Sequence, residues 1–174
     1  NYEDAQSVET LTDYLRGSTT LDGIINAAGV VAFGPASETG PETTVQLFAI
    51  NALGPIQLFT ALHPMLVQSK LSGKEPVVVN ISGVVAEQPM PNLAAYSASK
   101  TAIAGFLDAV TREWRREGIR VLNTYPGHTE TGLASRAISG VAPQFPQGMS
   151  AEHVVSRIIK GIVEDEKTLP SSEF

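Results

Sequence analysis

The chain has 174 residues, of which 43% are hydrophobic and 17% charged, which is enough for one domain with a buried core. A formal net charge of −6 and the lack of a basic block argue against a nucleic-acid-binding surface. No apolar run reaches membrane-spanning length and the N-terminus does not resemble a signal peptide, so we expect a soluble, cytoplasmic protein with no membrane partner.

The first half of the chain predicts a helix, a buried strand and a second, longer helix. Apolar residues at helical spacing predict the first helix over residues 4–16. Residues 21–26 form a short apolar run that predicts a strand. The second helix is expected over residues 41–68, with a kink at Pro55 and a further disturbance at Pro64.

The second half continues the alternation of strands and helices. Residues 76–81 are continuously apolar, which is typical of a strand covered on both faces in a parallel sheet. A long helix that ends at Gly118 precedes a third strand over residues 119–124. Residues 132–149, rich in Gly and Pro, predict a loop, and residues 151–164 predict a final helix.

This order of elements predicts one α/β domain over residues 1–174, with a parallel sheet between two layers of helices. Ligands of such sheets bind beyond the carboxyl ends of the strands. Asn26, Ser82 and residues 125–127 follow three different strands, so we expect them to converge at that edge.

Tyr96 and Lys100 are the strongest chemical signal in the sequence. Residues four apart lie on one face of a helix, so the ammonium group should stand close to the phenol. A nearby cation favours the phenolate and is expected to lower the tyrosine pKa from about 10 toward neutrality, where general acid–base catalysis is efficient. The spacing alone does not establish a catalytic pair, because an exposed Tyr and Lys on an ordinary helix can have the same spacing.

Four motifs in order make the chain resemble the short-chain dehydrogenase/reductase (SDR) family of NAD(P)-dependent enzymes on a Rossmann-type sheet. Asn26-Ala27-Ala28-Gly29 is similar to the family's Asn-Asn-Ala-Gly turn, with Ala27 in place of the second Asn. Residues 49–54 resemble the segment with the structural Asn, Tyr96 and Lys100 the catalytic pair, and residues 125–131 the Pro-Gly-x-x-x-Thr element.

The resemblance implies a catalytic role for three of these side chains. Tyr96 would exchange a proton with a carbonyl or alcohol oxygen, and Lys100 would lower the Tyr96 pKa and hold the nicotinamide ribose. Asn51 would anchor a water that relays protons to Lys100. It could also bond a backbone group freed by Pro55, and both roles can hold together.

The resemblance also implies a cofactor site for NAD or NADP, with NADP slightly favoured by the family. Asn26, Ala27, Ala28 and Gly29 would line the central part of the cofactor. Pro126, Gly127 and Thr131 would contact the nicotinamide amide and the pyrophosphate, although a Pro-Gly pair after a strand is also an ordinary turn.

One departure from the family concerns the hydroxyl that binds the substrate oxygen. The family's active-site Ser corresponds to Gly83, which has no hydroxyl, and Ser82 is the nearest replacement. Losing such a donor can cost about 10²-fold or more in rate. Neighbouring strand residues face opposite sides, so Ser82 could act only if a bulge, or the freedom of Gly83, re-aimed it.

A second departure is that the chain contains no Gly-x-x-x-Gly-x-Gly turn, which in the family cradles the pyrophosphate. About two βα units and a strand, on the order of 60 residues, would be needed to supply it. We therefore expect an upstream segment in the natural protein. Without it, the strand at residues 23–25 should expose an apolar edge.

The remaining residues give weaker indications. Loop 132–149 is expected to act as a substrate lid, with Pro89, Met90, Leu133, Phe145 and Met149 either lining an apolar pocket or packing as an ordinary loop. No His, Asp and Glu cluster has metal-ligand spacing, so no metal is expected. By family resemblance, we expect a homodimer or homotetramer.

Together these observations predict an NAD(P)-dependent oxidoreductase acting on a small-molecule carbonyl or secondary alcohol. The alternative is a catalytically impaired relative that binds or scaffolds, because the serine donor is missing. With the upstream residues restored, cofactor turnover and its loss in Tyr96→Phe distinguish the two.

Overall fold

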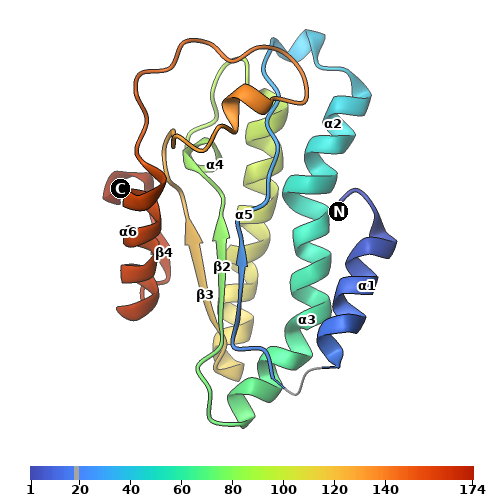
Figure 1. The fold of residues 1–174 in the computed structure, drawn as a ribbon, viewed down its shortest axis with the longest axis vertical. Coiled ribbons are helices and arrows are strands. Elements are labelled where there is room, and N and C mark those ends of the chain that lie inside the picture. The colour runs from blue at the N-terminus through green and yellow to red at the C-terminus, as the bar shows by residue number, and fades with distance from the viewer. Residues whose placement is uncertain (18–19) are drawn as a thin grey trace.

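Four parallel strands form one sheet in a computed structural model that describes residues 1–17 and 20–174 (Figure 1). In sheet order the strands are β1 (Gly23–Asn26), β2 (Val77–Ile81), β3 (Arg120–Thr124) and β4 (Thr168–Leu169). The chain therefore has the Rossmann-type α/β fold expected from its sequence. β4 was not predicted, because its two residues are too few to form a recognisable apolar run.

The helices lie in two layers, one on each face of the sheet (Figure 1). The helices are α1 (Ala5–Arg16), α2 (Pro41–Phe48), α3 (Gly54–Leu71), the single turn α4 (Val84–Glu87), α5 (Ala94–Trp114) and α6 (Ala151–Val163). α3 and α5 cover one face, α6 covers the other, and α1 packs on the outside of α3. Apart from α4, these agree with the sequence-based expectations to within a few residues.

Strict alternation along the strands divides the core between the two layers. Val78 of β2 is fully buried against α3 and α5, in a cluster that includes Phe59 and Leu107. Its neighbour Val79 is equally buried but faces the other way, against α6. The continuous apolar character of β2 is thus explained by burial on both faces.

The long second helix is interrupted earlier than its prolines suggest. A π-helical turn over Ala49–Leu53 joins α2 to α3, so the irregularity precedes Pro55, which occupies the first turn of α3. α3 then continues through Pro64 without a break, contrary to prediction. Pro41–Leu71 is also long and apolar enough to cross a membrane by length and composition alone, although its buried residues Phe59, Leu62 and Leu66 pack in the core.

β1 lies at one edge of the sheet. Within the described residues it pairs with β2 and with no other strand. Ile25, on the face of β1 opposite α3 and α5, is 65% exposed. The apolar edge expected from the sequence is therefore present.

Candidate active site

The carboxyl ends of β1, β2 and β3 meet at one edge of the sheet, where the first turns of α5 also lie (Figure 1). Lys100, on α5, is 7% exposed and donates a hydrogen bond of 2.8 Å from Nζ to the carbonyl oxygen of Ile81, the last residue of β2. Burial lowers the pKa of Lys100 to about 8, because the ammonium group loses its hydration. Lys100 is therefore a buried cation fixed to the sheet.

Tyr96 lies one turn before Lys100 and is 9% exposed. Burial raises the pKa of the Tyr96 phenol to about 12. The expectation of a lowered pKa is wrong for the chain as described, because burial removes the hydration that the phenolate needs. At neutral pH Tyr96 thus carries its proton.

Asn51 connects three segments of the site from the π-helical turn. Its Oδ1 accepts a hydrogen bond of 2.9 Å from the Val30 backbone N–H, and its Nδ2 donates to the Val30 carbonyl at 2.9 Å. The same Nδ2 donates to Ser99 Oγ at 3.0 Å, and Ser99 in turn donates to the carbonyl oxygen of Tyr96 at 2.7 Å. The predicted bond to a group freed by Pro55 is not among these, so that alternative is wrong.

Gly29 lies in the space between these side chains. A Cβ atom added there would stand 3.3 Å from Asn51 Oδ1 and 3.4 Å from Lys100 Nζ. Ala27 and Ala28 precede it with exposed, small side chains that leave the backbone accessible. The turn after β1 therefore offers a close approach to Lys100 that a larger residue at position 29 would narrow.

Asn26 differs from the rest of this turn because it belongs to a buried row of asparagines. Asn26, Asn80 and Asn123 are register partners on adjacent strands. Asn26 Nδ2 donates to Asn80 Oδ1 at 2.7 Å, and Tyr2 donates to Asn26 Oδ1 at 3.3 Å. Its side chain is thus engaged inside the sheet rather than directed to the cofactor region.

Ser82 extends the same row and is fully buried. Its hydroxyl donates to Asn123 Oδ1 at 2.7 Å and accepts from Asn80 Nδ2 at 2.9 Å. Because the single hydroxyl proton is given to Asn123, the idea that Ser82 is re-aimed to serve the substrate is not supported. Successive side chains of a strand point to opposite faces, so residues 80 and 82 lie on the same face, and the Ser82 hydroxyl is therefore directed to the asparagine row.

Gly83 has a φ of 82°, and a side chain there would be strained. The segments after β2 and β3 are joined at this point: Ser82 N–H donates to the Thr124 carbonyl at 2.8 Å, and Val84 N–H donates to the Pro126 carbonyl at 2.9 Å. The Pro126–Gly127 turn is therefore held at the carboxyl edge. Thr131 lies further out and is exposed.

The loop over residues 132–149 passes over the carboxyl edge of the sheet (Figure 1), and its role as a substrate lid stays a prediction. Ile138 N–H donates to the Val31 carbonyl and Phe33 N–H to the Ser139 carbonyl, each at 2.9 Å. Leu133 and Phe145 pack in the cluster that contains Tyr96. The other residues of the predicted apolar pocket do not lie together with Leu133 and Phe145. Met149 packs against α6, and Pro89 and Met90 line a hollow on the outer face of α5.

Sequence reasoning missed Ser99 and the asparagine row. A signal for the row was available, since three apolar strands each contain Asn at the same place, in Gly-Ile-Ile-Asn, Val-Val-Val-Asn and Arg-Val-Leu-Asn. Ser99 had no such signal, because its role depends on how α5 packs against the π-helical turn.

A comparison with protein families agrees with this geometry: the model of the short chain dehydrogenase family matches residues 1–141. The chain belongs to the short-chain dehydrogenase family. Among relatives of known name, a "Dehydrogenase/reductase SDR family protein 7-like" of Anopheles gambiae is 30% identical over 154 residues, which cover 84% of this chain and 47% of the relative.

Two further comparisons concern a named reductase and a solved structure. An "NADPH-dependent 3-dehydrocapnine reductase" of Ornithobacterium rhinotracheale is 28% identical over 87% of this chain and 53% of its own. The solved structure of a short-chain dehydrogenase from Sphingobium yanoikuyae in complex with NADPH shares the fold with a TM-score of 0.86 at 24% identity, over 98% of this chain and 65% of that one. The chain thus spans about half the length of the curated relatives it matches.

Proposed function

We propose that the protein is an NAD(P)-dependent oxidoreductase that transfers hydride between a nicotinamide and a carbonyl or secondary alcohol. The observation that carries the proposal is the placement of Tyr96 and Lys100, one turn apart at the carboxyl edge of the sheet, with Lys100 anchored to Ile81. Family membership supports the same reaction class.

The residues of this chain fit the nicotinamide half of such a cofactor. Lys100 has three N–H donors and, within the described residues, uses one of them on Ile81, which leaves two for ribose hydroxyls. Gly29 keeps the approach to Lys100 open, and Gly127 lies at the same edge. When bound, the nicotinamide would supply or accept the hydride.

In this proposal Tyr96 moves the proton. Its raised pKa keeps the phenol protonated at neutral pH, which is the form required to protonate a carbonyl oxygen during reduction. Asn51 holds Val30 and the Ser99–Tyr96 turn in fixed positions, and the water relay expected from the family remains a prediction. Leu133 and Phe145 would exclude water and favour an apolar substrate.

The test is NAD(P)H oxidation on a panel of ketones and aldehydes by the protein with its expected upstream segment restored, with NADH and NADPH compared. Tyr96→Phe should lower kcat by about 10²- to 10⁴-fold while cofactor binding, followed by fluorescence, persists. Tyr14→Phe is the matched control, since Tyr14 is 79% exposed on α1. Equal activity of the two variants would contradict the proposed role of Tyr96.

The second candidate is a family member that binds cofactor without turnover and acts as a binding or scaffolding protein. Gly83 at the position of the usual serine, and the engagement of Ser82 with Asn123, favour it. Cofactor binding with no turnover on the panel, unchanged in Tyr96→Phe, would support this candidate over the enzyme.

We also propose a homodimer or homotetramer. The outward face of α5 carries the small, exposed residues Ala98, Ala102, Gly105 and Ala109, which permit close packing of a second helix. Sedimentation of the full chain, with Ala102→Arg as the disrupting variant, tests this assembly.

A further inference from the structure

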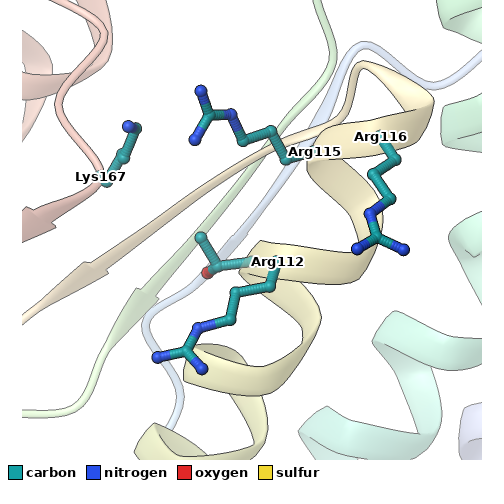
Figure 2. A pocket seen from close by; sticks show the side chains of 5 residues that line it. Arg112, Arg115, Arg116 and Lys167 are labelled. Atoms are coloured by element: carbon teal, nitrogen blue, oxygen red, sulfur yellow. The ribbon is translucent and has the colours of Figure 1, made fainter.

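A second hollow lies at the other end of α5, far from Tyr96. Its volume is about 580 Å³, and it is lined by residues of the last turn of α5, of the following 3₁₀ turn, and of the segment before β4 (Figure 2). The lining residues are Thr111, Arg112, Arg115, Arg116 and Lys167. Arg112 is 16 residues beyond Tyr96, or about 24 Å along the helix axis at the usual rise. This hollow is therefore separate from the proposed active site.

The four cations of the hollow differ from every other Lys and Arg of the chain. The protein has 12 such residues, and within the described residues eight of them have an ion pair or a hydrogen bond from the side chain. Arg112, Arg115, Arg116 and Lys167 have neither in that part of the chain. Asp108 and Glu113, their nearest acidic neighbours on α5, make no ion pair with them. The hollow thus gathers the cations that are not neutralised by the fold.

A purely structural explanation accounts for some of these residues. Cations near the last turn of a helix are stabilised by the helix dipole, which suits Arg112, Arg115 and Arg116. The helix dipole does not explain the position of Lys167, because this residue belongs to another segment, after α6. Its carbonyl accepts from Asn123 N–H at 3.4 Å, which holds this segment beside β3. In Figure 2, the Arg115 side chain points toward Lys167 across the hollow.

We propose that this hollow binds a phosphate-type oxyanion carried by a small molecule or headgroup. Guanidinium groups match phosphate oxygens in geometry and charge, and Arg115 faces the ammonium group of Lys167 across the hollow, whereas Arg112 and Arg116 line it with side chains that point away from Lys167 (Figure 2). The volume is within the range of small-molecule sites. Thr111 adds no donor, since its hydroxyl is given to the Leu107 carbonyl at 2.7 Å.

The charge of the rest of the chain favours a compact anion over an extended one. The net charge is −6 although these four residues contribute +4, so the remainder of the surface is strongly acidic. A long polyanion such as a nucleic acid would meet that repulsion as it leaves the hollow. A single phosphate or pyrophosphate group is short enough to stay within it.

Titration of the full chain with inorganic pyrophosphate, by calorimetry at low ionic strength, tests the proposal. Arg112→Gln with Arg115→Gln should weaken binding at least tenfold, because two of the four cations that line the hollow are lost. Arg16→Gln with Lys160→Gln is the matched control, since it removes two exposed, ion-paired cations from elsewhere and changes the net charge equally. Thermal melting verifies that both variants are folded.

Equal weakening in both variants would show a general charge effect and overturn the proposal, as would the absence of binding at millimolar pyrophosphate. Co-sedimentation with phosphatidylcholine vesicles, with and without a phosphoinositide, distinguishes the source. Binding of pyrophosphate without vesicle binding supports a soluble phosphorylated ligand. Vesicle binding that Arg112→Gln with Arg115→Gln abolishes supports a headgroup. Binding of a poly-glutamate peptide but not of pyrophosphate would also overturn the proposal of a phosphate-type ligand.

Discussion

The two ends of α5 hold their cations in opposite ways. Near its start, Lys100 is buried, bonded to a backbone carbonyl, and has a pKa lowered to about 8. At its end, Arg112, Arg115 and Arg116 are exposed and unpaired within the described residues. One helix thus presents a single enclosed cation at the sheet's carboxyl edge and a group of solvated ones at the opposite end.

This difference between the two ends of α5 shows that the surroundings of a cation determine which role it can have. A buried charge acts on its immediate neighbours in a low dielectric and is hardly screened by salt. Exposed charges act weakly one by one, so an effect at the far end depends on several of them together and fades as salt rises. Lys100 therefore suits chemistry, and the arginines suit recognition of an anion.

Lys100→Met should separate activity from stability most strongly. We expect the reduction rate to fall by about 10²- to 10⁴-fold, because the variant removes the cation that we propose positions the cofactor and favours proton transfer. The melting temperature should stay level or rise, because an ammonium group with a lowered pKa is held at an energetic cost. Arg115→Met, at the other end of the helix, should change the rate less than twofold.

A large loss of both activity and stability in Lys100→Met would contradict this account, since Lys100 would then be needed for folding. Lys160→Met on α6 is the matched control. Lys160 is exposed and paired weakly with Glu164, so neither property should change.

The pH dependence of reduction gives the next largest effect. Lys100 is charged below its pKa of about 8 and loses the proton as the pH rises through that value, so kcat/KM should decline by up to about tenfold per pH unit above it. Tyr96, with a pKa of about 12, stays protonated throughout. Pyrophosphate binding should not weaken over the same range, because guanidinium groups remain charged. A flat rate profile across pH 8 would argue against Lys100.

The sequence was sufficient for the three longer strands of the sheet and for placing Tyr96 and Lys100 one turn apart on one helix. Continuous apolar runs such as Val77–Ile81 identify strands buried on both faces, and the four-residue spacing places two side chains on one face of a helix. Both depend on local periodicity. β4 and the π-helical turn at Ala49–Leu53 were missed, because neither leaves a periodic pattern.

Features that depend on tertiary surroundings could not be predicted. Spacing shows that Lys100 is near Tyr96, but only packing shows that burial raises the pKa of the phenol. Likewise, the sequence shows three arginines within residues 112–116, but only the fold shows that Lys167, about fifty residues later in the chain, lines the same hollow. A search of the sequence for runs of basic residues underestimates the number of cations in a surface patch that is assembled from separate segments.

Ser82→Ala tests whether Ser82 stabilises the fold or takes part in the reaction. Removing the hydroxyl leaves Asn80 Nδ2 and Asn123 Oδ1 with their long mutual hydrogen bond of 3.5 Å and each with one partner fewer, so the free energy of unfolding should fall by about 1–3 kcal/mol. The value of kcat should change only a few-fold. Ser156→Ala, on an exposed position of α6, is the control for stability. A loss of kcat near 10²-fold with unchanged unfolding would restore Ser82 as a substrate ligand.

The smallest expected effect concerns the lid over the buried end of α5. Gly140 has a φ of 72° and is packed against the Phe33 carbonyl, so Gly140→Ala adds a strained backbone and pushes the lid away from Phe33. Gly73→Ala is matched to it, because Gly73 has a φ of 82° but open space around it. Both variants should lose about 1 kcal/mol of stability from the backbone term. Only Gly140→Ala should raise KM a few-fold and speed proteolysis within residues 132–149, since the Ile138–Val31 and Phe33–Ser139 hydrogen bonds hold the lid there. Equal KM values in the two variants would mean that closure of this loop does not govern access to Tyr96.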